Sequence, residues 1–143
     1  MSKKRVLMVD DEVGFTRMAK ATLEALGQYS VEVVNQPTDA ISTARRFKPD
    51  IILLDIIMPG MDGAKVASQL QKDPELRDIL VIFLTATVSG KAAAHDGVVT
   101  GGWRFLSKPI AVADLVRCME TWFAEKERHP ATDPPVTGAA PEA

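Results

Sequence analysis

Residues 51–55 read Ile-Ile-Leu-Leu-Asp, an unbroken apolar run that ends in a carboxylate. A run of this length and composition is typical of a strand buried on both faces of a sheet. Three further runs have the same character, and a fourth alternates between apolar and polar residues, as a strand nearer an edge would. These segments are Val6–Val9, Leu80–Leu84, Trp103–Leu106 and the alternating Ser30–Val34.

Between these runs, apolar residues recur at the three- and four-residue spacing of amphipathic helices. The last such segment, Val112 to about Lys126, places Leu115 and Trp122 on one face. Gly27 and Pro37 stand where one helix should end and where the next should make its first turn. Strands that alternate with helices predict right-handed crossovers and a parallel sheet covered on both sides, which is an α/β fold of five units.

One segment fits this pattern poorly. Residues 88–102 should hold the fourth helix, yet they contain four glycines and only one short stretch of good helix formers, Lys91–His95. We expect a short or irregular helix there. Beyond Arg128, four prolines in fifteen residues and very few large apolar side chains predict a disordered tail over residues 129–143. Residues 1–128 then form one folded domain.

Composition narrows the class of protein. The chain has 143 residues, 46% apolar and 25% charged, as expected for one soluble globular domain. A net charge of −2 with scattered Lys and Arg argues against direct binding to nucleic acid or to an anionic membrane. The single cysteine, Cys118, rules out an intrachain disulfide and favours a reducing compartment. The run Val6–Val9 is too short for a signal peptide or a membrane span, so we expect a cytoplasmic protein.

Chemically active side chains follow four of the predicted strands, where ligands of open parallel sheets bind. They are Asp10 and Asp11 after the first strand, Asp55 at the third, Thr85 at the fourth and Lys108 after the fifth. Three crowded carboxylates repel one another unless a cation neutralises them, and Mg²⁺ suits a site with few carboxylates and a phosphate oxygen. This pattern predicts Asp55 as a nucleophile toward phosphorus, with Lys108 balancing the transferred charge.

From about Lys4 to Glu125, the chain resembles the receiver domains of two-component signalling. The features that carry the resemblance are Asp10-Asp11, the run Leu54–Gly63 (LDIIMPGMDG), Thr85-Ala86 and Lys108-Pro109. Together, in this order and at these spacings, they are far more specific than any one of them alone. The resemblance implies a flavodoxin-like, doubly wound sheet of five parallel strands in the order 2-1-3-4-5, with helices on both faces.

The resemblance also implies the metal site. Asp55 would be the phosphorylated residue. Asp11, Asp55 and the main-chain carbonyl of Ile57 would bind Mg²⁺, and Asp10 would hold a metal-bound water. The side chain of Ile57 departs from the family pattern, which often has a polar residue there that influences the attacking water.

The resemblance assigns the remaining site residues to the switch. Thr85 would move its hydroxyl onto the new phosphate, and Phe105 would follow by turning inward. Lys108 would pair with the phosphoryl oxygens, held by a cis peptide bond to Pro109. Phe105 lacks the hydroxyl of the tyrosine found in some relatives, and the glycine-rich segment 88–102 replaces a usually regular helix, so the choice of partner cannot be inherited.

Three functions fit these observations and are given in decreasing order of support. The first is a phospho-acceptor module that takes a phosphoryl group from a sensor histidine kinase or a histidine phosphotransfer protein, and then docks to an unknown downstream protein or relays the group. Such a module turns over no free substrate and is not an enzyme in the usual sense. With nothing after Arg128 expected to fold, output would need a separate protein, and dimerisation on activation stays open.

The second function is a phosphorylation-independent adaptor that uses the irregular fourth-helix region as a binding face. The complete acidic site argues against it. The third is a small aspartyl phosphatase or mutase. Such enzymes commonly carry an Asp-x-Asp nucleophile motif on the first strand and a cap domain that encloses the substrate, whereas the nucleophile predicted here, Asp55, follows the third strand.

Overall fold

The computed structural model describes residues 3–58, 61–85, 98–100, 103–107 and 111–128. The elements follow one another in the order β1 (Lys4–Val9), α1 (Val13–Ala25), β2 (Tyr29–Val34), the short 3₁₀ helix η1 (Pro37–Asp39), α2 (Ala40–Phe47), β3 (Ile51–Asp55), β4 (Ile57–Met58), β5 (Met61–Asp62), α3 (Gly63–Lys72), β6 (Leu80–Thr85), β7 (Val98–Thr100), β8 (Trp103–Ser107) and α4 (Val112–Arg128). From β1 to β6, the strands of the main sheet alternate with helices along the chain, as the apolar spacing predicts.

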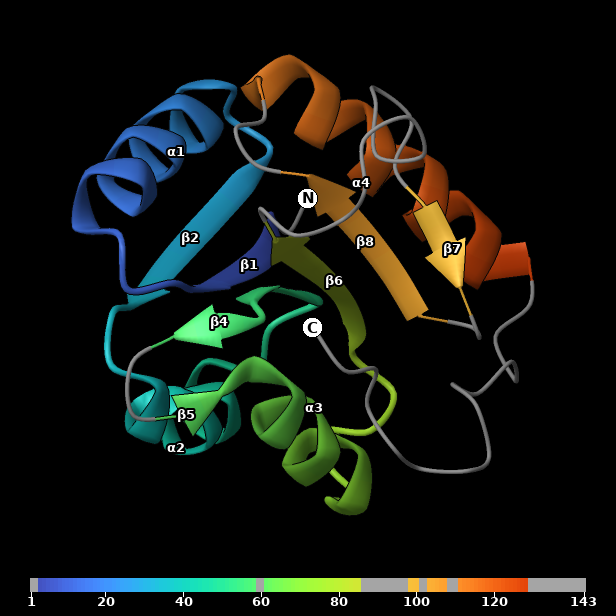
Figure 1. Cartoon of the computed structure of the whole chain (residues 1–143). Helices are drawn as coiled ribbons and strands as arrows, with labels where there is room; N and C mark the ends of the chain where they lie inside the picture. Colours follow the sequence, from blue (N-terminus) through green and yellow to red (C-terminus); the bar gives the residue numbers. More distant parts are fainter. Residues whose placement is uncertain (1–2, 59–60, 86–97, 101–102, 108–110, 129–143) are drawn as a thin grey trace.

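The main sheet contains the five predicted parallel strands in the order β2-β1-β3-β6-β8 (Figure 1). This confirms the doubly wound topology with strand order 2-1-3-4-5. The alternating segment forms the edge strand β2, and the most apolar segment forms β3, between β1 and β6. All five residues of β3 are buried, which explains why its sequence is continuously apolar up to Asp55.

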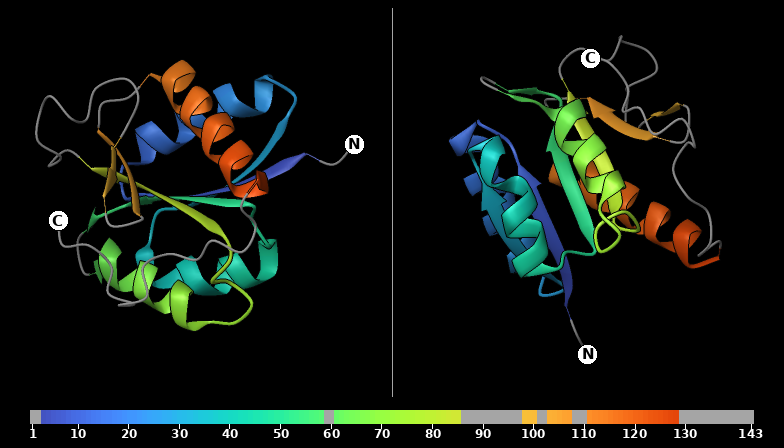
Figure 2. Two further views of the ribbon diagram at one scale, coloured as in Figure 1. Left: turned by 90° about the vertical axis from the view of Figure 1, so that its right-hand side faces the viewer. Right: turned by 90° about the horizontal axis from the view of Figure 1, so that it is seen from below.

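Helices cover both faces of the sheet, and each face has its own core (Figures 1 and 2). Along β1, Val6 and Met8 pack into the core under α1 and α4, whereas Leu7 and Val9 pack into the core under α2 and α3. Successive side chains of a strand point to opposite faces, so a strand between two helical layers needs apolar residues at every position. Cys118 of α4 is buried on the α1 side.

The ends of the first helix and the start of the second follow the predicted signals. Gly27 has a φ of +84°, a conformation that glycine adopts without steric cost, and its N–H donates to the Glu24 carbonyl at 3.0 Å. Pro37 begins η1, where its missing N–H costs nothing. These turns direct the chain back toward the sheet at each crossover.

Two features were not predicted. Val98–Thr100 forms β7, which pairs antiparallel with β8 at the edge of the sheet, within the segment where the sequence predicted an irregular helix. Val and Thr are β-branched and favour strands, and this preference outweighs the helical expectation at these three residues. The second feature is a separate two-stranded sheet formed by Ile57–Met58 and Met61–Asp62.

Residues 86–97 and the predicted tail 129–143 lie outside the described residues.

Within the described part of the chain, no helix combines the length and the apolar character that crossing a membrane requires.

Candidate functional site

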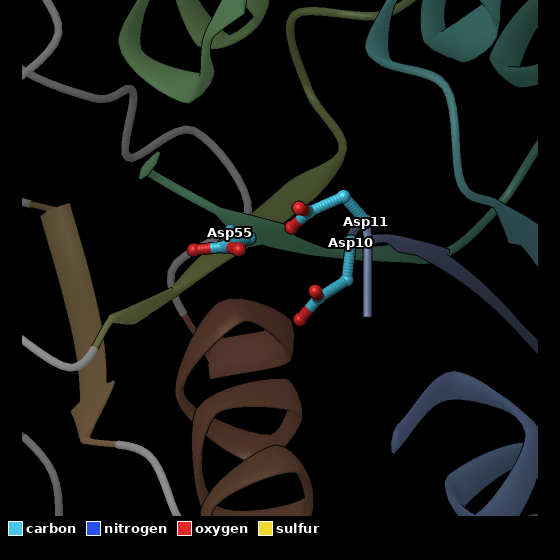
Figure 3. A group of neighbouring side chains, drawn as sticks. All are labelled: Asp10, Asp11 and Asp55. Carbon is cyan, nitrogen blue, oxygen red and sulfur yellow. The ribbon is translucent and has the colours of Figure 1, made fainter. Parts of the chain in front are cut away.

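Three aspartates gather where β1 and β3 end (Figure 3). Carboxylate oxygens of Asp10, Asp11 and Asp55 all lie within 4.8 Å of one another. β1 and β3 are parallel neighbours, with Val9 opposite Leu54, so the next residue of each strand brings Asp10 beside Asp55. The predicted carboxylates therefore meet at the carboxyl edge of the sheet.

The site is largely closed to water on its inner side. Asp10 and Asp55 are 0% and 5% exposed, whereas Asp11 remains accessible to solvent. Burial strengthens the repulsion between like charges because the surrounding protein screens them less than water does. A cluster with two buried members and one open side suits a cation that enters from solvent.

The backbone holds Asp10 from both sides. Its N–H donates to the carbonyl of Val34 at 3.0 Å, which continues the pairing of β1 with β2 beyond the last strand residue. Its Oδ1 accepts the N–H of Glu12 at 2.9 Å, so the side chain also shapes the turn into α1. The orientation of this carboxylate is thus fixed by local structure.

The position of Asp55 is set by its neighbouring strand β6 and by Gly63 at the start of α3. Asp55 pairs with Leu84 in the sheet register, and the N–H of Ile56 donates to the Leu84 carbonyl at 3.3 Å. The N–H of Gly63, the first residue of α3, donates to the Ile56 carbonyl at 2.7 Å. A Cβ at residue 63 would lie 2.7 Å from the Ile56 Cα and closer still to the Asp55 carbonyl oxygen, so only glycine fits there.

The remaining predicted residues are placed to different extents. Thr85 is the last residue of β6 and lies at the same edge as Asp55, next to β3 in the sheet. Ile57 begins β4, two residues beyond Asp55, and pairs with Asp62. Lys108 and Pro109 lie outside the described residues, so their predicted roles and the cis peptide bond stay predictions.

Phe105 faces the interior. Its side chain is 8% exposed and its ring stacks on Phe83 of β6, with 5.3 Å between ring centroids and 24° between ring planes. The two residues are direct partners in the pairing of β6 with β8. Phe105 thus faces inward in this structure, while its turn on phosphorylation stays a prediction. Phe83 is a contact that the sequence did not single out.

Asn35 is a second residue that sequence reasoning missed. Its side-chain Nδ2 donates to the carbonyl oxygen of Asp10 at 2.8 Å and to Oγ1 of Thr16 at 3.1 Å. A signal was present, because Asn35 directly follows β2 and so belongs to the same sheet edge as the aspartates. Asn35 is uncharged and belongs to none of the motifs that mark the other site residues.

The donor set of this site fits a hard divalent cation. Three carboxylates supply oxygen ligands and negative charge within a small volume, and a bound cation would relieve their mutual repulsion. Oxygen-only ligands of this number suit Mg²⁺, which keeps several of its waters. The arrangement is chemically able to bind a cation and to present a carboxylate next to it.

Comparison with known proteins gives the family. The family model described as the response regulator receiver domain matches residues 6–120. The response regulator PleD of Caulobacter vibrioides is 42% identical over 106 residues, which cover 74% of this chain and 23% of PleD. The response regulator MprA of Mycobacterium leprae is 34% identical over 112 residues, 78% of this chain and 47% of MprA. The chain thus spans less than half the length of these two relatives.

Solved structures agree with the fold. A receiver domain protein described as CheY-like, from Methanospirillum hungatei, superposes with a TM-score of 0.72 at 22% identity, covering 90% of this chain and 99% of that one. The chemotaxis protein CheY4 of Vibrio cholerae has a TM-score of 0.71 at 25% identity, covering 84% of this chain and 98% of that one. The five-stranded parallel sheet is common to this group of structures.

Proposed function

This chain belongs to the family of response regulator receiver domains, and from that premise we propose that Asp55 accepts a phosphoryl group from a phosphohistidine in a Mg²⁺-dependent reaction. The observation that carries the proposal is the cluster of Asp10, Asp11 and Asp55, whose carboxylate oxygens lie within 4.8 Å of one another. Like charges held this close oppose folding, so the stability of the fold alone does not account for the cluster.

The proposed metal ligands are Asp11, Asp55 and the backbone carbonyl of Ile57, with Asp10 holding a metal-bound water. When bound, Mg²⁺ would supply positive charge against which phosphoryl oxygens can be placed. The protein contributes position, because Asp10 is held by two backbone hydrogen bonds and Asp55 by the register of β3 with β6. Most of the catalytic effect would come from this positioning and from charge.

The transfer conserves atoms and charge in a simple way. A carboxylate oxygen of Asp55 forms a bond to phosphorus as the bond between phosphorus and the donor imidazole nitrogen breaks. The imidazole nitrogen keeps that electron pair and takes up a proton, and Asp55 becomes an acyl phosphate. The signal ends by dephosphorylation: water attacks the phosphorus, the bond from phosphorus to the Asp55 oxygen breaks, and inorganic phosphate leaves.

Three further residues would link the phosphoryl group to the rest of the domain. We assign Lys108 to pairing with the phosphoryl oxygens and Thr85 to donating its hydroxyl to them. Phe105 would then report the state of the site to the surface around β8, and its stacking on Phe83 supports the inward position in that assignment. No free substrate is turned over in this scheme, so the chain acts as a self-catalysing signalling module rather than as an enzyme.

The proposed partners follow from the reaction. The donor would be a sensor histidine kinase or a histidine phosphotransfer protein, and the recipient of the signal would be a separate protein that docks on the domain or takes the phosphoryl group onward. The scattered charge of this chain favours a protein partner over nucleic acid or membrane. A dimer that forms on activation would be a further mode of output.

Beryllofluoride, a mimic of the phosphoryl group, tests the proposal directly. Amide NMR spectra of the wild type should show saturable shifts around Asp11, Asp55 and Phe105 when beryllofluoride and Mg²⁺ are both present. Asp55→Asn should abolish these shifts. Asp50→Asn is the matched control, because it makes the same chemical change at the opposite end of β3, where Asp50 accepts the N–H of Arg5 at 2.8 Å. A folded wild type without a response would favour the phosphorylation-independent adaptor.

A further inference from the structure

Asn35 connects three segments that meet at the acidic cluster. It directly follows the last residue of β2, and β2 is the neighbour of β1 in the sheet. Nδ2 of Asn35 bridges the Asp10 carbonyl, at the end of β1, and the Thr16 hydroxyl, in the first turns of α1. The side chain therefore spans both ends of the loop that carries the aspartates.

The chemistry of the partners fixes the direction of both hydrogen bonds. The Asp10 carbonyl can only accept, so the amide nitrogen of Asn35 must face it. The hydroxyl of Thr16 donates its own proton to the Val13 carbonyl at 3.1 Å, which leaves its oxygen to accept from Asn35. Thr16 is 1% exposed, so its alignment is shielded from competing water.

The loop between β1 and α1 also contains hydrogen bonds of its own. α1 begins after Glu12, whose side chain makes no capping hydrogen bond. The hydrogen bond from Thr16 N–H to the Glu12 carbonyl, at 3.1 Å, and the one from Glu12 N–H to Asp10 Oδ1 close the turn internally. Asn35 adds a side-chain link between this turn and the end of β2.

We propose that Asn35 is a positioning residue for the metal site: its side-chain amide holds the Asp10–Asp11 segment in the geometry that binds Mg²⁺, without touching the ion. This inference rests on the proposed function, because it assumes that the cluster binds a cation. Residues that orient metal ligands through hydrogen bonds typically change metal affinity by about 10- to 100-fold when removed. A single neutral amide should act near the lower end of that range.

The test compares Mg²⁺ binding by wild type and Asn35→Ala, followed through amide NMR shifts of Asp11 and Asp55. We expect the half-saturating Mg²⁺ concentration to rise about tenfold in Asn35→Ala. At saturating Mg²⁺, the rate of phosphorylation should return to that of the wild type, because the substitution removes no ligand. Thr16→Val, which removes one of the two acceptors, should raise the half-saturating Mg²⁺ concentration by a smaller factor. Thr16→Ser, which keeps the hydroxyl, should bind Mg²⁺ as the wild type does.

Hydrogen exchange in the metal-free protein measures the order of the loop between β1 and α1 independently of phosphorylation activity. In the metal-free protein, Asn35→Ala should increase the hydrogen exchange rate of the Glu12 amide, whose acceptor is the Asp10 carboxylate. Val31→Ala is the control for general destabilisation, because Val31 is a buried residue in the middle of β2, the strand that Asn35 follows. It should lower stability while leaving the Mg²⁺ midpoint unchanged.

The outcomes distinguish the inference from its premise. A wild type that shows no Mg²⁺ response overturns the proposed function and this inference with it. If the wild type responds to Mg²⁺ and Asn35→Ala has the same Mg²⁺ midpoint, the inference alone is overturned. Asn35 is then a structural residue like Val31. A raised midpoint that excess Mg²⁺ corrects, together with faster exchange at Glu12, supports it.

Discussion

Gly63 lies so close to the end of β3 that a Cβ on it would come within 2.7 Å of the Ile56 Cα. The atoms it would meet belong to the backbone of the segment that positions Asp55, so they cannot yield as a flexible side chain would. The first residue of α3 thereby fixes how closely the helix approaches the candidate site.

Gly63→Ala should therefore destabilise the protein and displace Asp55. Overpacking against a fixed neighbour costs about 1–3 kcal/mol, and chemical denaturation would measure the loss. Gly14→Ala, in α1, is the matched control, because a Cβ built there meets no atom of the described residues within 4 Å outside its own turn of helix. That control should be neutral or stabilising by up to about 1 kcal/mol. Equal stability of Gly63→Ala and wild type would show that the close approach is not a constraint.

Glu24 should make the stability of the edge strand depend on pH. Its carboxylate accepts the N–H of Val31 at 3.1 Å and pairs with Lys20 at 3.2 Å, while Lys20 donates to the Val31 carbonyl. The hydrogen bond from Val31 holds the pKa of Glu24 below its usual value, with a further contribution from Lys20. These contacts satisfy backbone groups on the outer edge of β2.

The sign of the pH effect follows from this lowered pKa. The carboxylate stabilises the folded state above the unfolded-state pKa of about 4.3, and its contribution disappears as the pH falls through the lower folded-state pKa. Glu24→Gln should lose less stability than wild type between neutral and acidic pH. Lys20→Met should leave the Glu24 pKa below normal, because the Val31 N–H remains. A Glu24 pKa that returns to normal in Lys20→Met would contradict this order of causes.

The stacked pair Phe83 and Phe105 should contribute to stability and to the orientation of Phe105. Phe83→Leu keeps an apolar side chain but removes the ring contact, and we expect it to lower the free energy of unfolding by about 1–3 kcal/mol. NMR contacts between the Phe105 ring and the core under α2 and α3 should weaken. Phe47→Leu, at a partly buried position beside the same core, is the control. Unchanged contacts of Phe105 in Phe83→Leu would show that stacking does not hold the ring.

Most of the sheet could be predicted because its strands are buried on both faces. In β3 and β1 this burial imposes continuous apolar runs, and such runs are visible in a single sequence. The acidic site could be predicted for a related reason. Parallel strands bring their carboxyl ends to one edge, so Asp10 and Asp55 had to be near each other once their strands were neighbours.

The roles of Asn35 and Gly63 depend on contacts between segments that are far apart or that no local pattern encodes. Asn35 acts on residues 25 and 19 positions away in sequence, and nothing in the neighbouring residues marks those partners. The role of Gly63 comes from the distance between a helix and a strand end, which composition does not reveal. β7 was not predicted because the four glycines of residues 88–102 disfavour regular structure, whereas the β-branched triplet Val98–Thr100 favours a strand.

The most direct test of the central claim is the intact mass of the protein after incubation with acetyl phosphate, a small phosphoryl donor, with Mg²⁺ or with excess chelator. We predict that wild type and Asp50→Asn gain one phosphoryl group only when Mg²⁺ is present, and that Asp55→Asn gains none. Labelling of Asp55→Asn at the wild-type level, or labelling of the wild type that survives removal of Mg²⁺, would contradict the assignment of Asp55 as the metal-dependent phospho-acceptor.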